Sequence, residues 1–149
     1  GITFEKPLRL EPLPQQGHRV LATHVSAPLG VIVHELNKRS SNFVAEQVVR
    51  ALGAEVVGAP GTWDKGLEAI ARWLESIGVT RGTYRMQNGA GLYDSNRFSA
   101  EQIAFIVRAA MRDFRIASEY LASMSLAATD GTLAQRMGGG FAARFVRGK

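Results

Sequence analysis

Apolar side chains recur at the three- and four-residue spacing of an amphipathic helix along most of this chain. The clearest stripe joins Trp63, Leu67, Ile70, Leu74 and Ile77. In chain order, helices are expected at about 28–38, 42–52, 63–77, 100–114, 117–123 and 130–137. The last of these is expected to be capped by Asp130. The pattern therefore predicts a mostly helical fold.

Small polar residues and glycines mark the ends of several predicted helices. Thr62 and Ser99 are expected N-caps, because a hydroxyl oxygen accepts a hydrogen bond from an unpaired N–H of the first turn. Gln102 stands where it completes a capping box with Ser99. Gly53 and Gly78 suit left-handed C-terminal caps. These signals set the expected helix boundaries.

Three short stretches are instead rich in β-branched and apolar residues and predict strands at 19–25, 83–87 and 141–147. Asn88-Gly89, directly after the second, is typical of a tight turn. No stretch has an obvious partner strand, and unpaired strands leave backbone N–H and C=O groups without hydrogen bonds. We therefore expect an α+β, mostly helical chain whose partner strands lie outside these 149 residues.

Composition and charge narrow the class of protein. Apolar residues make up 46% and charged residues 21%, which is typical of a folded globular domain. The net charge of +5 would suit an anionic partner, but 14 of the 18 basic residues are arginines scattered singly along the chain. Nucleic-acid binding normally uses a clustered basic patch. We therefore expect no nucleic-acid partner.

Neither a metal site nor a phosphate loop is expected. His18, His24 and His34 have no carboxylate at a usual metal-ligand spacing, and the chain contains no cysteine. The glycine run 138–140 is not followed by the Lys-Ser/Thr pair of a phosphate-binding loop. No cofactor is therefore predicted.

The tripeptide Ser40-Ser41-Asn42 lies between the end of one predicted helix and the start of the next. Hydroxyl and carboxamide groups at such a junction can serve as a plain N-cap for the second helix. They can also point into a cleft, where a neutral hydroxyl both donates and accepts hydrogen bonds. The tripeptide alone leaves both interpretations open.

Several blocks follow one another in order along the chain: residues 37–42, 88–92, 96–99, 125–133 and 145–149. Together they resemble the D-Ala-D-Ala carboxypeptidase/endopeptidase family, the class C low-molecular-mass penicillin-binding proteins. The resemblance covers about residues 18–149. Within the block 88–92, Asn88 and Ala90 depart from the family's usual Asp and Ser.

The resemblance implies a partial serine β-lactamase/transpeptidase-like (penicillin-binding) domain. Its parent enzyme would hydrolyse D-Ala-D-Ala bonds of peptidoglycan peptides through an acyl-enzyme, and would also bind β-lactams. By resemblance, Ser40 passes a proton toward the leaving D-alanine and Asn42 orients the substrate amide. Lys149 supplies positive charge near the substrate carboxylate, and Leu92 lines the cleft.

Two of the three motifs that penicillin-binding enzymes use are incomplete here. None of the nine serines has a lysine three positions later, so the Ser-x-x-Lys nucleophile is absent. Lys149 is expected to be the first residue of a Lys-Thr-Gly motif that the sequence does not complete. The 149 residues alone are therefore expected to be inactive.

The expected organisation has three parts: an extended, proline-containing lead-in at 1–19, a helix-rich subdomain at 20–140, and the start of the Lys-Thr-Gly strand at 141–149. The resemblance implies a periplasmic or cell-envelope location. Apolar surface left uncovered in such a piece favours association with a second copy or with the missing part. The alternative is a non-catalytic binding module for an anionic envelope polymer or a protein partner.

Overall fold

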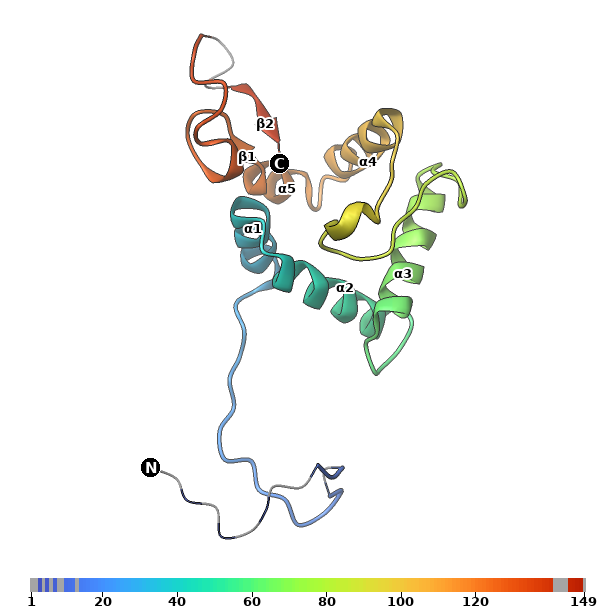
Figure 1. Cartoon of the computed structure of the whole chain (residues 1–149), viewed down its shortest axis with the longest axis vertical. Helices are drawn as coiled ribbons and strands as arrows, with labels where there is room; N and C mark the ends of the chain where they lie inside the picture. The colour runs from blue at the N-terminus through green and yellow to red at the C-terminus, as the bar shows by residue number, and fades with distance from the viewer. Residues whose placement is uncertain are drawn as a thin grey trace.

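The computed structural model describes residues 3, 5, 7, 10–12, 14–140 and 145–148. Within these residues the chain folds into five α-helices, two short 3-10 helices and a two-stranded sheet (Figure 1). The elements are α1 (Leu29–Arg39), α2 (Asn42–Val56), α3 (Trp63–Ser76), η1 (Leu92–Asp94), α4 (Ala100–Arg112), α5 (Ala117–Ser123), β1 (Ser125–Leu126), η2 (Gly131–Leu133) and β2 (Arg147–Gly148). The mostly helical α+β prediction is confirmed.

Residues 19–28, before α1, run as an extended trace away from the helices (Figure 1). Val20, Leu21 and Val25 are 70–82% exposed, and residues 19–25 form no strand. The strand prediction for this segment was wrong. Its β-branched composition favours an extended backbone, but in the described part of the chain no second strand lies beside it to complete the hydrogen bonds.

α2 and α3 pack more extensively against each other than any other pair of elements, and glycines allow their close approach. Gly53 is buried within α2, and a Cβ there would lie 2.6 Å from the backbone N of Gly66. A Cβ on Gly66 would in turn overlap the carbonyl oxygen of Val49. The prediction that Gly53 caps α2 was therefore wrong, because this glycine serves helix packing and α2 continues to Val56.

The caps predicted for Thr62, Gly78 and Ser99 are confirmed. The Thr62 hydroxyl accepts from the Lys65 N–H at 3.3 Å. Gly78, with a φ of +93°, follows α3 in the left-handed region where glycine has no steric penalty. Ser99 and Gln102 form both bonds of the capping box at the start of α4.

α5 leads into a small unit formed by β1, η2 and β2 (Figure 1). β1 pairs antiparallel with β2, with Ser125 opposite Gly148 and Leu126 opposite Arg147. Part of the predicted strand 141–147 lies outside the described residues, and β2 itself is Arg147–Gly148. The unit therefore brings the C-terminal strand next to the chain that follows α5.

Two further predictions need correction. Residues 83–87 form no strand; the only pairing there, within the described chain, is one bridge between Arg85 and Arg97. Residues 130–137 form only the 3-10 turn η2, not an α-helix capped by Asp130. The Asp130 carboxylate is bonded elsewhere, to Lys38 and to the Leu126 N–H, so it is not available as a cap.

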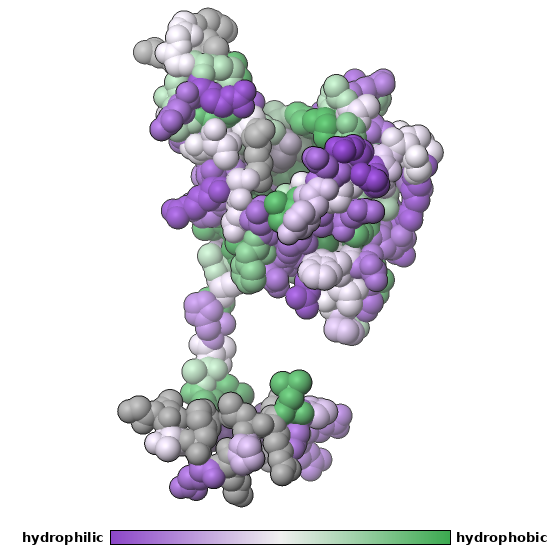
Figure 2. Space-filling model, viewed as in Figure 1, coloured by the Kyte–Doolittle hydropathy of each residue, from purple (hydrophilic) through white to green (hydrophobic). Residues whose placement is uncertain are grey.

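The core is small. Buried apolar residues in the described chain are Val49, Ala69, Leu74, Val79, Ala110, Ala127 and Leu133. Large apolar side chains are exposed on several elements, including Phe43 at 73% and Phe114 at 90%, and Figure 2 shows apolar surface among the polar side chains. Among the described residues, no helix has both the length and the apolar character needed to cross a membrane.

Candidate active site

The junction between α1 and α2 is a tight turn made by three consecutive polar residues. Ser40 ends α1 in the left-handed conformation, with φ 54° and ψ 49°, and its N–H donates to the Leu36 carbonyl at 2.8 Å. A left-handed residue commonly ends a helix, but glycine is the usual choice because a Cβ costs about 1 kcal/mol there. A serine at this position is therefore not explained by backbone conformation.

The capping role at this junction belongs to Ser41. Its side chain accepts from the Val44 N–H at 3.4 Å, a long bond, as α2 begins. Ser40 and Asn42 are both exposed, and within the described residues neither their hydroxyl nor their carboxamide makes a hydrogen bond. The N-cap interpretation therefore accounts for Ser41 and leaves the two predicted site residues without a structural role.

Two neighbouring side chains join the end of α1 to the last residue of α5 and to the chain that follows it. Asn37 Nδ2 donates to the Ser123 hydroxyl at 2.8 Å, and Ser123 is buried. Lys38 Nζ donates to the Met124 carbonyl at 2.7 Å and to both carboxylate oxygens of Asp130 at 2.8 Å. The Ser40 turn is thus attached to the unit that contains β1 and β2.

Asp130 lies in a strongly cationic and hydrogen-bonding environment. The Lys38 ammonium, followed by the Leu126 N–H, lowers the pKa of the Asp130 carboxyl from its usual value. Because the Asp130 side chain is 44% exposed, solvent screening keeps the contribution of the ion pair to folding stability small.

Leu92 begins η1 in a loop that has its own hydrogen-bond framework. Asn88 Oδ1 accepts from the Gly91 N–H at 2.6 Å, and Asn88 Nδ2 donates to the Ser95 hydroxyl at 2.6 Å. Asn96 binds the same turn from the other side, through the N–H and the carbonyl of Asn88. Leu92 itself is 42% exposed on this ordered loop.

A glutamate on α2 anchors that loop. The Ala90 N–H donates to Glu46 Oε1 at 2.9 Å, and a Cβ on Gly89 would lie 2.7 Å from the Val49 side chain. The loop with Leu92 therefore packs on the helix that Asn42 begins. Lys149, the remaining predicted site residue, lies outside the described residues; it follows Gly148 of β2 in the sequence.

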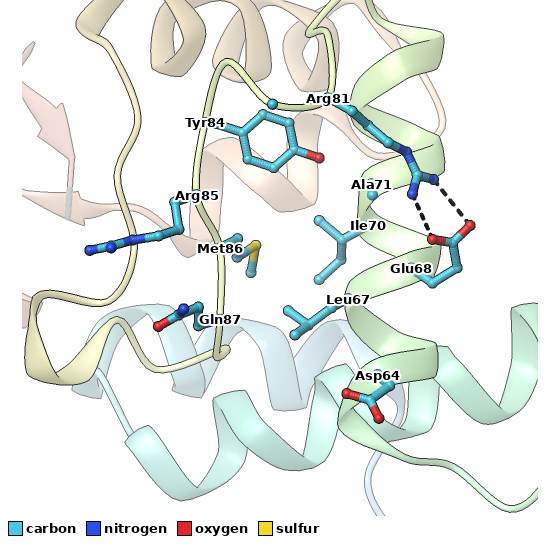
Figure 3. A pocket seen from close by; sticks show the side chains of 11 residues that line it. Asp64, Leu67, Glu68, Ile70, Ala71, Arg81, Tyr84, Arg85, Met86 and Gln87 are labelled. Carbon is cyan, nitrogen blue, oxygen red and sulfur yellow. Dashed lines mark hydrogen bonds and ion pairs between the residues drawn. The ribbon is translucent and has the colours of Figure 1, made fainter.

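A groove with a volume of about 480 Å³ lies elsewhere (Figure 3). It runs between α3 and residues 81–87, with Leu67, Ile70 and Tyr84 among its lining. None of the predicted site residues lines it. On its rim, Arg81 forms an ion pair with Glu68 at 2.8 Å.

Sequence reasoning missed three residues that organise the site: Lys38, Glu46 and Asp130. Lys38 lies inside the motif block, and a lysine at the end of a helix is usually interpreted as a solvated partner of the helix dipole. Asp130 was assigned as a cap. No metal site emerges either: among the described residues no group of three or more His, Asp or Glu side chains is arranged to hold an ion.

Comparison with known proteins identifies the family of this chain. The sequence model of the D-Ala-D-Ala carboxypeptidase 3 (S13) family matches residues 1–149. A D-alanyl-D-alanine carboxypeptidase of Actinomadura sp. (strain R39) is 33% identical over 156 residues, which cover the whole of this chain and 29% of that protein. D-alanyl-D-alanine carboxypeptidase DacB of Haemophilus influenzae is 27% identical over 139 residues, covering 93% of this chain and 28% of its own length.

The fold is also shared with a solved structure. Penicillin binding protein 4 (dacB) from Haemophilus influenzae matches with a TM-score of 0.79 at 24% identity, over 90% of this chain and 30% of that one. The same protein complexed with a novel beta-lactam matches with a TM-score of 0.75 at 22% identity, over 93% and 32%. The chain thus spans less than a third of the length of the relatives that it matches.

Proposed function

The chain belongs to the D-Ala-D-Ala carboxypeptidase 3 (S13) family, and from that premise we propose that it forms part of a serine-type D-Ala-D-Ala carboxypeptidase or endopeptidase acting on peptidoglycan peptides. The observation that carries the proposal is the state of the Ser40-Ser41-Asn42 turn. Ser41 performs the capping, while the Ser40 hydroxyl, in a strained left-handed position, makes no hydrogen bond to any residue that the structure describes. Backbone strain of this kind is found preferentially at functional sites.

The proposed reaction is acyl transfer through a serine ester. A serine hydroxyl attacks the carbonyl carbon of the penultimate D-alanine, the C–N bond breaks, and the terminal D-alanine leaves as an amine that must gain a proton. Water then hydrolyses the ester and restores the hydroxyl. The nucleophile belongs to a Ser-x-x-Lys motif that these residues do not contain, so the 149-residue chain alone carries out no turnover.

Each site residue has a role suited to its chemistry. The Ser40 hydroxyl both donates and accepts, so it can relay a proton to the departing amine. The Asn42 carboxamide, one residue beyond the cap, orients the substrate amide. The Lys149 ammonium attracts the terminal carboxylate of the substrate as a point charge. Leu92 lines the cleft from a loop attached to α2.

The substrate class also sets the proposed partners and location. Peptidoglycan stem peptides and the β-lactams that mimic them are the ligands of the complete protein. Because this substrate lies in the cell wall, we assign the complete protein to the bacterial periplasm or cell envelope. The basic surface of these 149 residues, with a net charge of +5, suits an anionic wall polymer.

A fluorescent penicillin provides the test, since it acylates the nucleophile and leaves a covalent label that a denaturing gel displays. The complete protein that contains these residues is expected to give a labelled band, which prior incubation with an unlabelled β-lactam removes. The chain 1–149 is expected to give none. A complete protein that stays unlabelled, or a labelled 1–149 chain, would contradict the proposal.

A further inference from the structure

The ammonium group of Lys38 is hydrogen-bonded to both ends of the segment that contains β1. Lys38 lies two residues before Ser40, near the end of α1. Its three N–H donors are matched by three short bonds, one to the Met124 carbonyl at 2.7 Å and two to the Asp130 carboxylate at 2.8 Å. The side chain is only 14% exposed. Lys38 is therefore fixed more tightly than a surface lysine.

The segment that Lys38 binds is the one that carries β1. Asp130 Oδ1 accepts from the Leu126 N–H at 2.8 Å, and the Asp130 N–H donates back to the Leu126 carbonyl at 3.1 Å. Leu126 in turn stands opposite Arg147 in the antiparallel β1–β2 pair. Three successive contacts, Lys38 to Asp130, Asp130 to Leu126 and Leu126 to Arg147, thus connect the Ser40 turn with the strand after which Lys149 follows in the sequence.

Close packing around the Lys38–Asp130 ion pair restricts movement of the end of α1 relative to the β1–η2 segment. A Cβ on Gly131 would overlap the Ser125 hydroxyl and lie 3.2 Å from the Lys38 carbonyl oxygen. The Ser125 hydroxyl itself accepts from the Thr132 N–H at 3.0 Å, and Ser125 is fully buried. The end of α1 and the β1–η2 segment therefore touch backbone to backbone around the charged pair.

We propose that Lys38 and Asp130 are positioning residues that set the spacing between the Ser40-Asn42 turn and strand β2. This inference rests on the proposed function, because it assumes that groups on both sides act on one substrate. Neither residue is expected to touch that substrate. Displacement of a reacting group by about 1 Å can lower a rate by about a hundredfold, so a small loosening here has a large kinetic effect.

The test uses the complete protein and the variant Lys38→Met, which keeps the aliphatic stem and removes the three N–H donors. The number of reactive sites is counted with a stoichiometric β-lactam, and the acylation rate constant per site is then measured at a temperature where the variant is fully folded. We expect the same number of sites and a rate constant lower on the order of tenfold to a hundredfold. With a D-Ala-D-Ala peptide, the loss is expected mainly in kcat.

Lys65→Met is the matched control. Lys65 also ties a turn through carbonyl oxygens, those of Gly58 at 2.6 Å and Pro60 at 3.0 Å, but it lies at the α2–α3 connection and contacts none of the site residues. It is expected to lose stability without losing acylation rate. The conservative variant Lys38→Arg is expected to recover part of the rate, because it restores the charge with a different geometry.

The outcomes separate the two proposals. If the wild-type protein acylates and Lys38→Met acylates at the same rate per site, the positioning role is refuted and the proposed function stands. If the wild type does not acylate, both are refuted. Asp130→Asn, which keeps the Lys38 bond to Met124, gives the same test should Lys38→Met fail to fold, with an unchanged rate again counting against the positioning role.

Discussion

The Ala90 N–H donates a 2.9 Å hydrogen bond to Glu46 Oε1, one helical turn after Asn42 on α2. This bond attaches the loop that carries Leu92 to the helix that starts at the Ser-x-Asn turn. The second carboxylate oxygen, Oε2, is buried and has no hydrogen-bond partner in the described part of the chain. Glu46 thus contributes one useful acceptor and one unsatisfied anionic oxygen.

Two substitutions at Glu46 separate these contributions. Glu46→Gln keeps an oxygen for the Ala90 N–H and exchanges the unpaired oxygen for an unpaired amide NH2 group, so the free energy of unfolding should change little. Glu46→Ala leaves the Ala90 N–H without its acceptor and should cost about 1–3 kcal/mol. Urea unfolding measures both, and amide hydrogen exchange at Ala90 reports the bond directly. Unchanged protection of Ala90 in Glu46→Ala would contradict this account.

The contact between α2 and α3 depends on the absence of a side chain at Gly66. Gly66→Ala brings a Cβ into the carbonyl oxygen of Val49, and overpacking of this kind typically costs about 1–3 kcal/mol. Gly30→Ala is the control, because Gly30 lies in the first turn of α1 with no atom near the added Cβ, and the change should stabilise the helix by less than about 1 kcal/mol. Thermal unfolding of both variants checks the difference in sign. Equal effects would show that the two helices pack less closely than described.

The bonds that Glu68 of α3 makes with Arg81 and Arg72 should break only at low pH. Hydrogen bonds from Arg81, and then from Arg72, lower the pKa of Glu68 from 4.5 to about 2. Because the folded pKa is the lower one, the stabilising effect is complete above pH 4.5 and disappears as the pH falls toward 2. Carboxyl-carbon NMR should give a midpoint near 2 for Glu68. Arg81→Gln should move it upward, and a wild-type midpoint near 4.5 would refute the network.

Sequence signals that involve neighbouring residues predicted most of the helices. They did not predict the contacts between distant parts of the chain. Thr62 and Ser99 were correctly identified as caps because capping involves only neighbouring residues. Gly53 was misassigned, since its role depends on Gly66 of another helix. Asp130 was misassigned for the same reason, because its partner Lys38 is distant in sequence.

The sequence also predicted only part of the candidate site. The family resemblance rested on sequence blocks, and the family match confirms it. The roles of Ser40, Asn42, Leu92 and Lys149 stay predictions. What the sequence could not supply is the attachment of the α1–α2 turn to β1 and β2, because it rests on one lysine side chain bonded across 92 residues of chain. Periodicity and capping rules carry no information about such a pair.

The most direct test of the Ser40 hydroxyl compares Ser40→Ala with Ser41→Ala in the complete protein, by the rate of penicillin acylation and the free energy of unfolding. Removing a proton-transfer group typically costs roughly 10²–10⁴ in rate, so Ser40→Ala should acylate that much more slowly with its stability retained. Ser41→Ala removes the α2 cap and should lose about 1 kcal/mol of stability while acylating at the wild-type rate. Acylation at the wild-type rate by Ser40→Ala would contradict the account.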